Sequence, residues 1–143
     1  MSLKENTYVF QDWFSLDLPE NWEFEREEQI LNIYSTVKPK GVLQISFFIN
    51  EEKGSLDDVA KLHLDNFISQ FEIEIDINTY TTIESPDFVV ATVCGSHKNS
   101  FIKIWIIVNS EKLLLVTYNS TKKSRELSKV DDIVYSVDFN NII

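Results

Sequence analysis

The sequence predicts an α+β domain in which an antiparallel β-sheet with a meander is backed by two main α-helices. Several segments of strand length are continuously apolar or alternate between apolar and polar residues. Two further segments repeat apolar residues at helical spacing. The last three predicted strands are joined by short polar connections, which favour antiparallel pairing. The 143 residues are enough for a single domain, residues 1–143, with a true hydrophobic core.

The first third of the chain contains five predicted extended segments. They cover residues 8–10, 14–16, 22–24, 30–37 and 42–49. We expect Pro19 to end one of the early segments, and Pro39-Lys40-Gly41 to form a turn. In the last segment one face carries Leu43, Ile45, Phe47 and Ile49.

A first helix is predicted to begin at Ser55. Ser55 precedes Asp58 by three residues, which is a typical helix start. Its apolar stripe comprises Leu56, Val59, Ala60, His63, Leu64, Phe67 and Phe71. Such a helix is about 24 Å long at ~1.5 Å per residue, which matches about five strands at ~4.8 Å spacing. We therefore expect it to cover a whole sheet.

The second half of the chain begins with a strand in which Ile73, Ile75 and Ile77 form the predicted buried face. Three long strands follow, at residues 88–94, 101–108 and 113–118. Both faces of the middle one are apolar, so we expect it to be central. A second helix is predicted over residues 124–137, with a stripe of Leu127, Val130, Val134 and Val137. Basic residues near its start, including Arg125, have the wrong sign for the helix dipole.

The net charge of −10 limits the classes of partner. Residues 1–90 carry 18 Asp and Glu against 6 Lys and Arg, whereas residues 91–143 carry 5 against 7. Nucleic acid is disfavoured, because its binding requires clustered Lys and Arg. A protein partner with a basic surface is permitted, although solubility alone also accounts for the charge.

The sequence shows no recognisable targeting signal. Residues 1–10 lack the basic and apolar regions of a signal peptide, and no apolar run approaches the ~20 residues that span a bilayer. Cys94 is the one cysteine, so no internal disulfide can form. We expect a cytoplasmic protein that does not interact with membranes.

Two acidic stretches are candidate partner-binding sites. The first contains Glu20, Glu23 and Glu25, and the second contains Glu72, Glu74 and Asp76. Alternate side chains on a strand stand about 7 Å apart, so the second set suits neither a calcium ion nor another single metal. It either protects a sheet edge against aggregation or receives a basic partner.

Catalytic patterns are weak. His63 lies in the helical stripe, where we expect a hydrogen-bonded core histidine; the alternative is a ligand-binding or general-base role in a pocket. Cys94 and His97 could form a nucleophilic pair, but an inert thiol beside an exposed imidazole is the simpler reading. Standard nucleotide, zinc and hydrolase motifs are missing, so we expect no cofactor, no metal and no enzyme activity.

Four segments together resemble the PsbP-like fold. They are Leu18-Pro19-Glu20-Asn21-Trp22, Ser55-Leu56, the strand from Leu113 to Tyr118, and Ser136-Val137-Asp138-Phe139. That fold includes the PsbP subunit of photosystem II, a nuclear-import factor that binds the GTPase Ran, and many uncharacterised bacterial proteins, which this chain resembles most. The resemblance implies an accessory or binding role and carries over no partner-binding residue.

Three hypotheses follow. The first is a non-catalytic protein-binding or accessory module with an acidic face. The second is an immunity or inhibitor protein for a basic toxin. The third is a small-ligand binder or enzyme with a pocket between helix and sheet that uses His63.

Overall fold

The computed structural model describes residues 5–139 of the chain, which form nine strands and two helices. The strands are β1 (Glu5–Phe10), β2 (Phe14–Pro19), β3 (Trp22–Glu27), β4 (Ile30–Ser35), β5 (Gly41–Ile49), β6 (Glu74–Glu84), β7 (Val89–His97), β8 (Ser100–Val108) and β9 (Lys112–Ser120). The helices are α1 (Leu56–Gln70) and α2 (Glu126–Tyr135). The predicted α+β class is confirmed.

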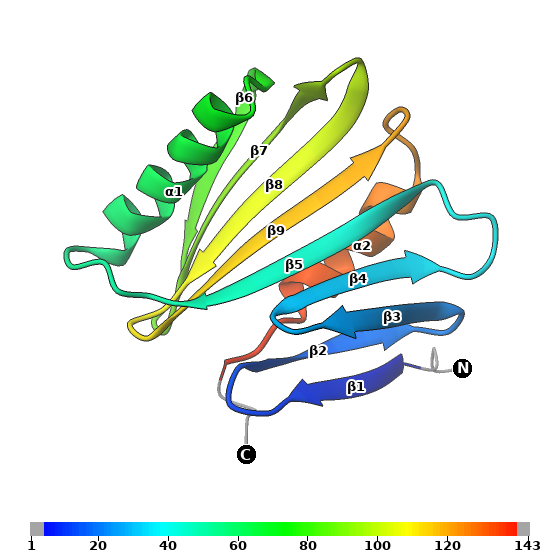
Figure 1. The fold of residues 1–143 in the computed structure, drawn as a ribbon, viewed down its shortest axis with the longest axis horizontal. Helices are drawn as coiled ribbons and strands as arrows, with labels where there is room; N and C mark the ends of the chain where they lie inside the picture. Colours follow the sequence, from blue (N-terminus) through cyan, green and yellow to red (C-terminus); the bar gives the residue numbers. More distant parts are fainter. Residues whose placement is uncertain (1–4, 140–143) are drawn as a thin grey trace.

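A seven-stranded antiparallel sheet organises the fold, in the order β3-β4-β5-β9-β8-β7-β6 (Figure 1). The predicted meander corresponds to β7, β8 and β9, which pair as consecutive neighbours. Strand β8 is covered on both sides, as its sequence predicts: Ile104 lies in the core on one face and Trp105 in the core on the other. Strands β1 and β2 form a separate hairpin.

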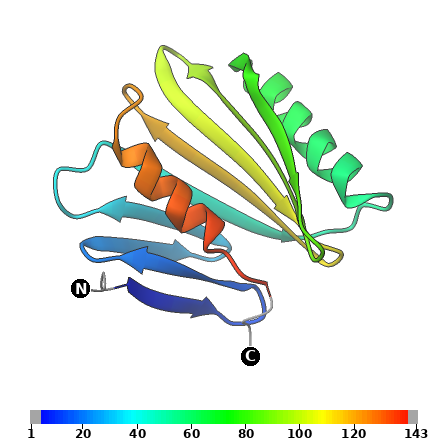
Figure 2. The ribbon, with the colours of Figure 1, turned by 180° about the vertical axis from the view of Figure 1, so that it is seen from behind.

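One face of the sheet is covered by α2 and the β1–β2 hairpin, as the view from behind shows (Figure 2). The four residues of the predicted α2 stripe are buried there, together with Ile133. Leu43, Ile45 and Phe47 of β5 face this core, as predicted. Ile49 does not: it is 60% exposed at the end of β5.

On the other face, α1 packs over β6, β7 and β8, and Leu113 at the start of β9 joins the same core (Figure 1). Ser55 caps the helix as predicted, because its Oγ accepts a hydrogen bond from the Asp58 N–H at 3.2 Å. Val59, Ala60 and Leu64 are buried against the sheet. The expectation that α1 covers the whole sheet is wrong, because the helix runs along the strands beside β6 rather than across them.

The edge strand β6 departs from its predicted alternation. Its pairing with β7 is interrupted between Asp76 and Thr81 by a register irregularity. A bulge leaves residues outside the ladder and turns the strand, so Ile77 is 67% exposed instead of buried. Within residues 5–139, neither helix is long and apolar enough to cross a membrane.

Candidate functional site

Half of the sheet lacks a helix on the α1 side, and its side chains form a surface that we call the open face. Side chains that are paired in register lie on one side of an antiparallel sheet. One such row runs through Glu25, Asn32, Gln44 and Thr117 on four consecutive strands. The open face comprises Glu23, Glu25, Glu27, Ile30, Asn32, Tyr34, Val42, Gln44, Ser46, Phe48, Leu115, Thr117 and Asn119.

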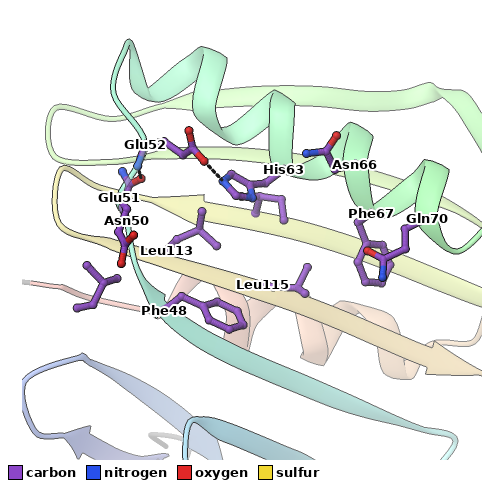
Figure 3. Close-up of a pocket in the computed structure, with 12 residues that line it drawn as sticks. Phe48, Asn50, Glu51, Glu52, His63, Asn66, Phe67, Gln70, Leu113 and Leu115 are labelled. Atoms are coloured by element: carbon purple, nitrogen blue, oxygen red, sulfur yellow. Dashed lines mark hydrogen bonds and ion pairs between the residues drawn. The ribbon is translucent and has the colours of Figure 1, made fainter.

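A groove follows the boundary between α1 and the open face. It consists of two adjoining hollows of about 480 and 240 Å³, both lined by Phe67 of α1 and Leu115 of β9. The larger hollow lies at the end nearer the start of α1, where Phe48 of β5 and Leu113 of β9 form part of its lining (Figure 3). A volume of this size lies within the range of ligand sites.

The floor of the larger hollow is apolar although it lies open to solvent, whereas polar side chains of the sheet, including Gln44 and Thr117, line the smaller hollow. Phe48 is 49% exposed, and Leu115 and Phe67 are half-buried. Phe48 and Phe47 are neighbours on β5 and therefore point to opposite faces of the sheet. The alternation in the sequence of β5 predicts only the buried face that carries Phe47. An aromatic residue on the supposedly wet face of an alternating strand was the signal that could have revealed the groove.

His63 projects from α1 into the larger hollow (Figure 3). Its side chain is 32% exposed, and its Nε2 atom is buried without a hydrogen-bond partner. Glu52 Oε1 lies 3.9 Å away, which is an ion pair only when the imidazole is protonated. The expected hydrogen-bonded core histidine is therefore wrong. The structure places His63 where the alternative prediction put it, in a pocket between helix and sheet.

Negative charge borders the open face on the side away from α1. Glu23 and Glu25 lie on edge strand β3 and are both exposed. The pKa of the nearby Tyr34 is raised, first by desolvation and then by the Glu25 and Glu23 carboxylates. Glu52 is close to the opposite side of the groove. The open face is thus acidic at its β3 edge, and Glu52 adds a carboxylate at one end of the groove.

The remaining predicted acidic residues lie elsewhere. Glu74 and Asp76 pair with Ser96 and Cys94 on the α2 side of the sheet, away from the open face. Glu72 follows the end of α1 in a left-handed conformation, with φ 51°. Glu20 lies in the turn between β2 and β3 and lines a separate hollow near α2. The structure therefore groups Glu23 with Glu25 and separates them from the other four.

Cys94 and His97 point to opposite faces of β7, because they are three positions apart on a strand. His97 lines the smaller hollow of the groove, whereas Cys94 lies on the α2 side beside Lys123. Burial raises the pKa of the Cys94 thiol, which disfavours the reactive thiolate. A Cys94–His97 pair is thereby excluded. Across residues 5–139, no three metal-ligating side chains gather into a site.

Sequence comparisons find no relatives: no protein-family model matches the chain, and a search of curated proteins gives no match. Structural comparison does find similar folds. Cyanobacterial PsbP (CyanoP) from Synechocystis sp. PCC 6803, known from a solution structure, superposes with a TM-score of 0.62 at 11% identity. The match covers 96% of this chain and 93% of CyanoP. The fold of this chain is therefore PsbP-like, as its sequence predicts.

A second similar structure is the crystal structure of a protein from Bacteroides thetaiotaomicron, with a TM-score of 0.63 and 14% identity. The match covers 92% of this chain but 47% of the Bacteroides protein, so this chain spans about half its length. At these identities the similarity concerns the fold.

Proposed function

We propose that this chain is a non-catalytic binding module whose open face receives a basic amphipathic α-helix from another protein. The observation that carries the proposal is the groove between α1 and the open face, together with the carboxylates of Glu23, Glu25 and Glu27 on the edge strand β3 of that face. Such a helix would lie beside α1 as a second member of the same layer. This is the helix-in-groove mode of peptide recognition.

The dimensions of the open face suit one helix. Four strands, β9, β5, β4 and β3, lie beyond the cover of α1 and span roughly 19 Å at ~4.8 Å spacing. A helix has a diameter of about 10 Å and packs at about 8–10 Å from its neighbour. Strand β5 has nine residues, about 30 Å, which matches a helix of about 20 residues.

The charges on the open face favour a cationic partner. Glu23, Glu25 and Glu27 follow one another on the same side of β3, and no lysine or arginine belongs to the open face as defined from the described residues. Complementary charge accelerates association and rejects partners of the wrong sign. The apolar floor at Phe48 and Leu115 would supply contact area, and the acidic border would select a basic outer face.

A binding role also agrees with the chemistry of the described residues. Cys94 and His97, the nucleophile and base considered as a pair above, are on opposite faces of the sheet. The resemblance to PsbP-like proteins, mostly accessory or binding proteins, points the same way. An immunity protein for a basic toxin would be one case of this proposal.

Selection from a displayed library of random peptides of about 20 residues tests the proposal. We expect enriched sequences that combine Lys or Arg with apolar residues at three- and four-residue spacing. Their binding should be lost in a Ser46→Trp variant, which fills the floor of the groove, and retained in a Ser96→Trp variant on the other side. Enrichment of acidic peptides, or binding that survives Ser46→Trp, would contradict the proposal.

A small apolar ligand in the larger hollow is a second candidate. The observation that favours it is the buried Nε2 of His63, which has no partner and could donate to or accept from a ligand. A metabolite screen by thermal shift tests this candidate. A ligand that raises the Tm of the wild type and not of His63→Ala would support it, and a screen without any shift would count against it.

A further inference from the structure

A second large hollow lies on the α2 side of the sheet, between the loop after β4 and the start of α2. Its volume is about 510 Å³. We call it the cationic pocket, because four basic residues, Lys38, Lys40, Arg125 and Lys129, outnumber the two carboxylates of its lining, Glu20 and Glu126. The basic residues of the pocket are four of the 13 in a chain of net charge −10, so their clustering runs against the overall composition.

Glu126 holds the walls of the cationic pocket together. Its Oε2 accepts a hydrogen bond from the Lys40 N–H at 3.0 Å. Its Oε1 accepts from the Gly41 N–H at 3.0 Å and from the Tyr118 hydroxyl at 2.8 Å. Both carboxylate oxygens are therefore occupied by donors that join β5, β9 and α2. The loop that carries Lys38 and Lys40 is fixed against the helix before any ligand binds.

The four cationic side chains are not paired with the carboxylates of the pocket. Within residues 5–139, none of them forms an ion pair with a carboxylate. Arg125 and Lys129 stand four residues apart at the start of α2, a spacing at which like charges repel. Cations at this end of a helix also oppose its dipole. The arrangement lowers the stability of the protein, and a bound anion would reverse each of these effects.

We infer that the cationic pocket binds a small phosphate-bearing anion. An arginine guanidinium matches phosphate oxygens in a bidentate manner, and lysines add point charges around it. The hollow is larger than a phosphate group needs, and Trp22 and Val37 also line it. The remaining volume could hold an organic group attached to the phosphate, which would lie against these apolar side chains. The site lies across the sheet from the open face and is independent of the function proposed above.

Calorimetric titration of the full chain with inorganic pyrophosphate tests this inference. At about 0.15 M salt, charges more than ~8 Å away are largely screened, so the remote carboxylates have little influence. We expect saturable binding at one site. The Arg125→Gln/Lys129→Gln variant should bind about tenfold more weakly or worse, which is ~1.4 kcal/mol. Lys53→Gln/Lys98→Gln has the same change of charge at two exposed positions outside the pocket and should bind as the wild type does.

Thermal unfolding without any anion supplies a second readout. Because Arg125→Gln/Lys129→Gln removes repulsion and the unfavourable dipole interaction, its Tm should rise by about 1–4 °C. Citrate, offered in place of pyrophosphate, distinguishes carboxylates from phosphates and should bind more weakly. The inference would be overturned if pyrophosphate binding were not saturable, or if Arg125→Gln/Lys129→Gln and Lys53→Gln/Lys98→Gln lost the same amount of affinity. It would also be overturned if the Tm of Arg125→Gln/Lys129→Gln fell, or if citrate bound more tightly than pyrophosphate.

Discussion

The Tyr34 hydroxyl donates a hydrogen bond of 3.2 Å to Glu25 Oε1, which joins β4 to edge strand β3 on the open face. Glu25 and Glu23 both raise the pKa of Tyr34, so both carboxylates lie near this hydroxyl. One strand further in, Gln44 Nε2 donates to Asn32 Oδ1 at 3.0 Å. The open face thus changes from acidic at β3, through polar amides, to apolar beside α1.

Reversal of the charge on β3 should weaken binding of a basic amphipathic helix. We expect Glu23→Lys/Glu25→Lys to lower affinity at least about tenfold, because attraction is replaced by repulsion at the β3 edge of the open face. The Tm should change little, since both side chains are exposed. Fluorescence anisotropy with a labelled Lys/Leu helical peptide measures the affinity.

The matched control for this variant is Glu72→Lys/Glu74→Lys. It carries the same change in net charge at exposed positions outside the open face. If this control weakens binding as much as Glu23→Lys/Glu25→Lys does, the attraction depends on total charge, and the acidic border has no specific role.

Truncation of the exposed aromatic residue on the groove floor should separate binding from stability. Phe48 is 49% exposed, so Phe48→Ala should lower the free energy of unfolding by less than about 1 kcal/mol. Loss of an aromatic anchor should still weaken helix binding by about 1–2 kcal/mol. Ile83→Ala, at a 40% exposed position on β6, is the control. Equal binding by Phe48→Ala and wild type would show that the groove floor is not used.

The sequence was sufficient for the fold class because its periodicities report local structure and burial. The alternation in β5 and the stripe of α2 each predict the buried face, and Ser55 predicts the start of α1. The direction of α1 across the sheet was not predictable, because an apolar stripe shows that a helix packs but not on which strands. The direction of α1 leaves half of the sheet uncovered, which creates the open face, and it places the half-buried His63 beside the groove.

The candidate site was predictable only in fragments. The acidic stretches of the sequence predict Glu23 and Glu25 as partner-binding residues, but they group these two with Glu20 and give Glu72, Glu74 and Asp76 equal weight. Register decides between them: Glu25 pairs with Asn32 on the open face, whereas Asp76 pairs with Cys94 on the other side. A single sequence does not show the register in which β3 pairs with β4, or β6 with β7. It therefore does not show which of the acidic side chains lie on the same face of the sheet.

Gly41 should not tolerate a side chain. A Cβ at this position would collide with the backbone carbonyl oxygen of Asn119 on the neighbouring strand β9. We expect Gly41→Ala to lower the free energy of unfolding by about 1–3 kcal/mol, because the two strands must separate to admit the methyl group. Urea denaturation measures the change. Gln44→Ala, at an exposed position on the same strand, should have a much smaller effect. A Gly41→Ala variant with an unchanged free energy of unfolding would contradict the tight pairing of β5 and β9.

Tyr118 should make stability decrease in alkaline solution. Burial first, and then the neighbouring Glu126, raise the pKa of Tyr118 from 10.0 to about 12. The unfolded state therefore loses this proton at lower pH than the folded state, and the free energy of unfolding falls as pH rises between these values.

Tyr118→Phe removes this contribution together with the hydrogen bond to Glu126. We expect the variant to be about 1 kcal/mol less stable near neutral pH and to decline less steeply above pH ~10. Part of the decline remains, because burial and Asp65 also raise the pKa of Tyr80 to about 12. Urea denaturation at a series of pH values checks this, with the exposed Tyr135→Phe as control. Parallel profiles for Tyr118→Phe and wild type would contradict the assignment.

Photo-crosslinking locates a bound helix most directly. A benzoylphenylalanine residue at Gln44 would stand in the middle of the open face, and the same residue at Asn78 would stand on the bulged edge strand β6. With a Lys/Leu helical peptide, we predict crosslinking from position 44, none from position 78, and loss of the product when Glu23→Lys/Glu25→Lys is combined with the label. Crosslinking from both positions alike, or from position 78 alone, would contradict the proposal that the open face is the binding site.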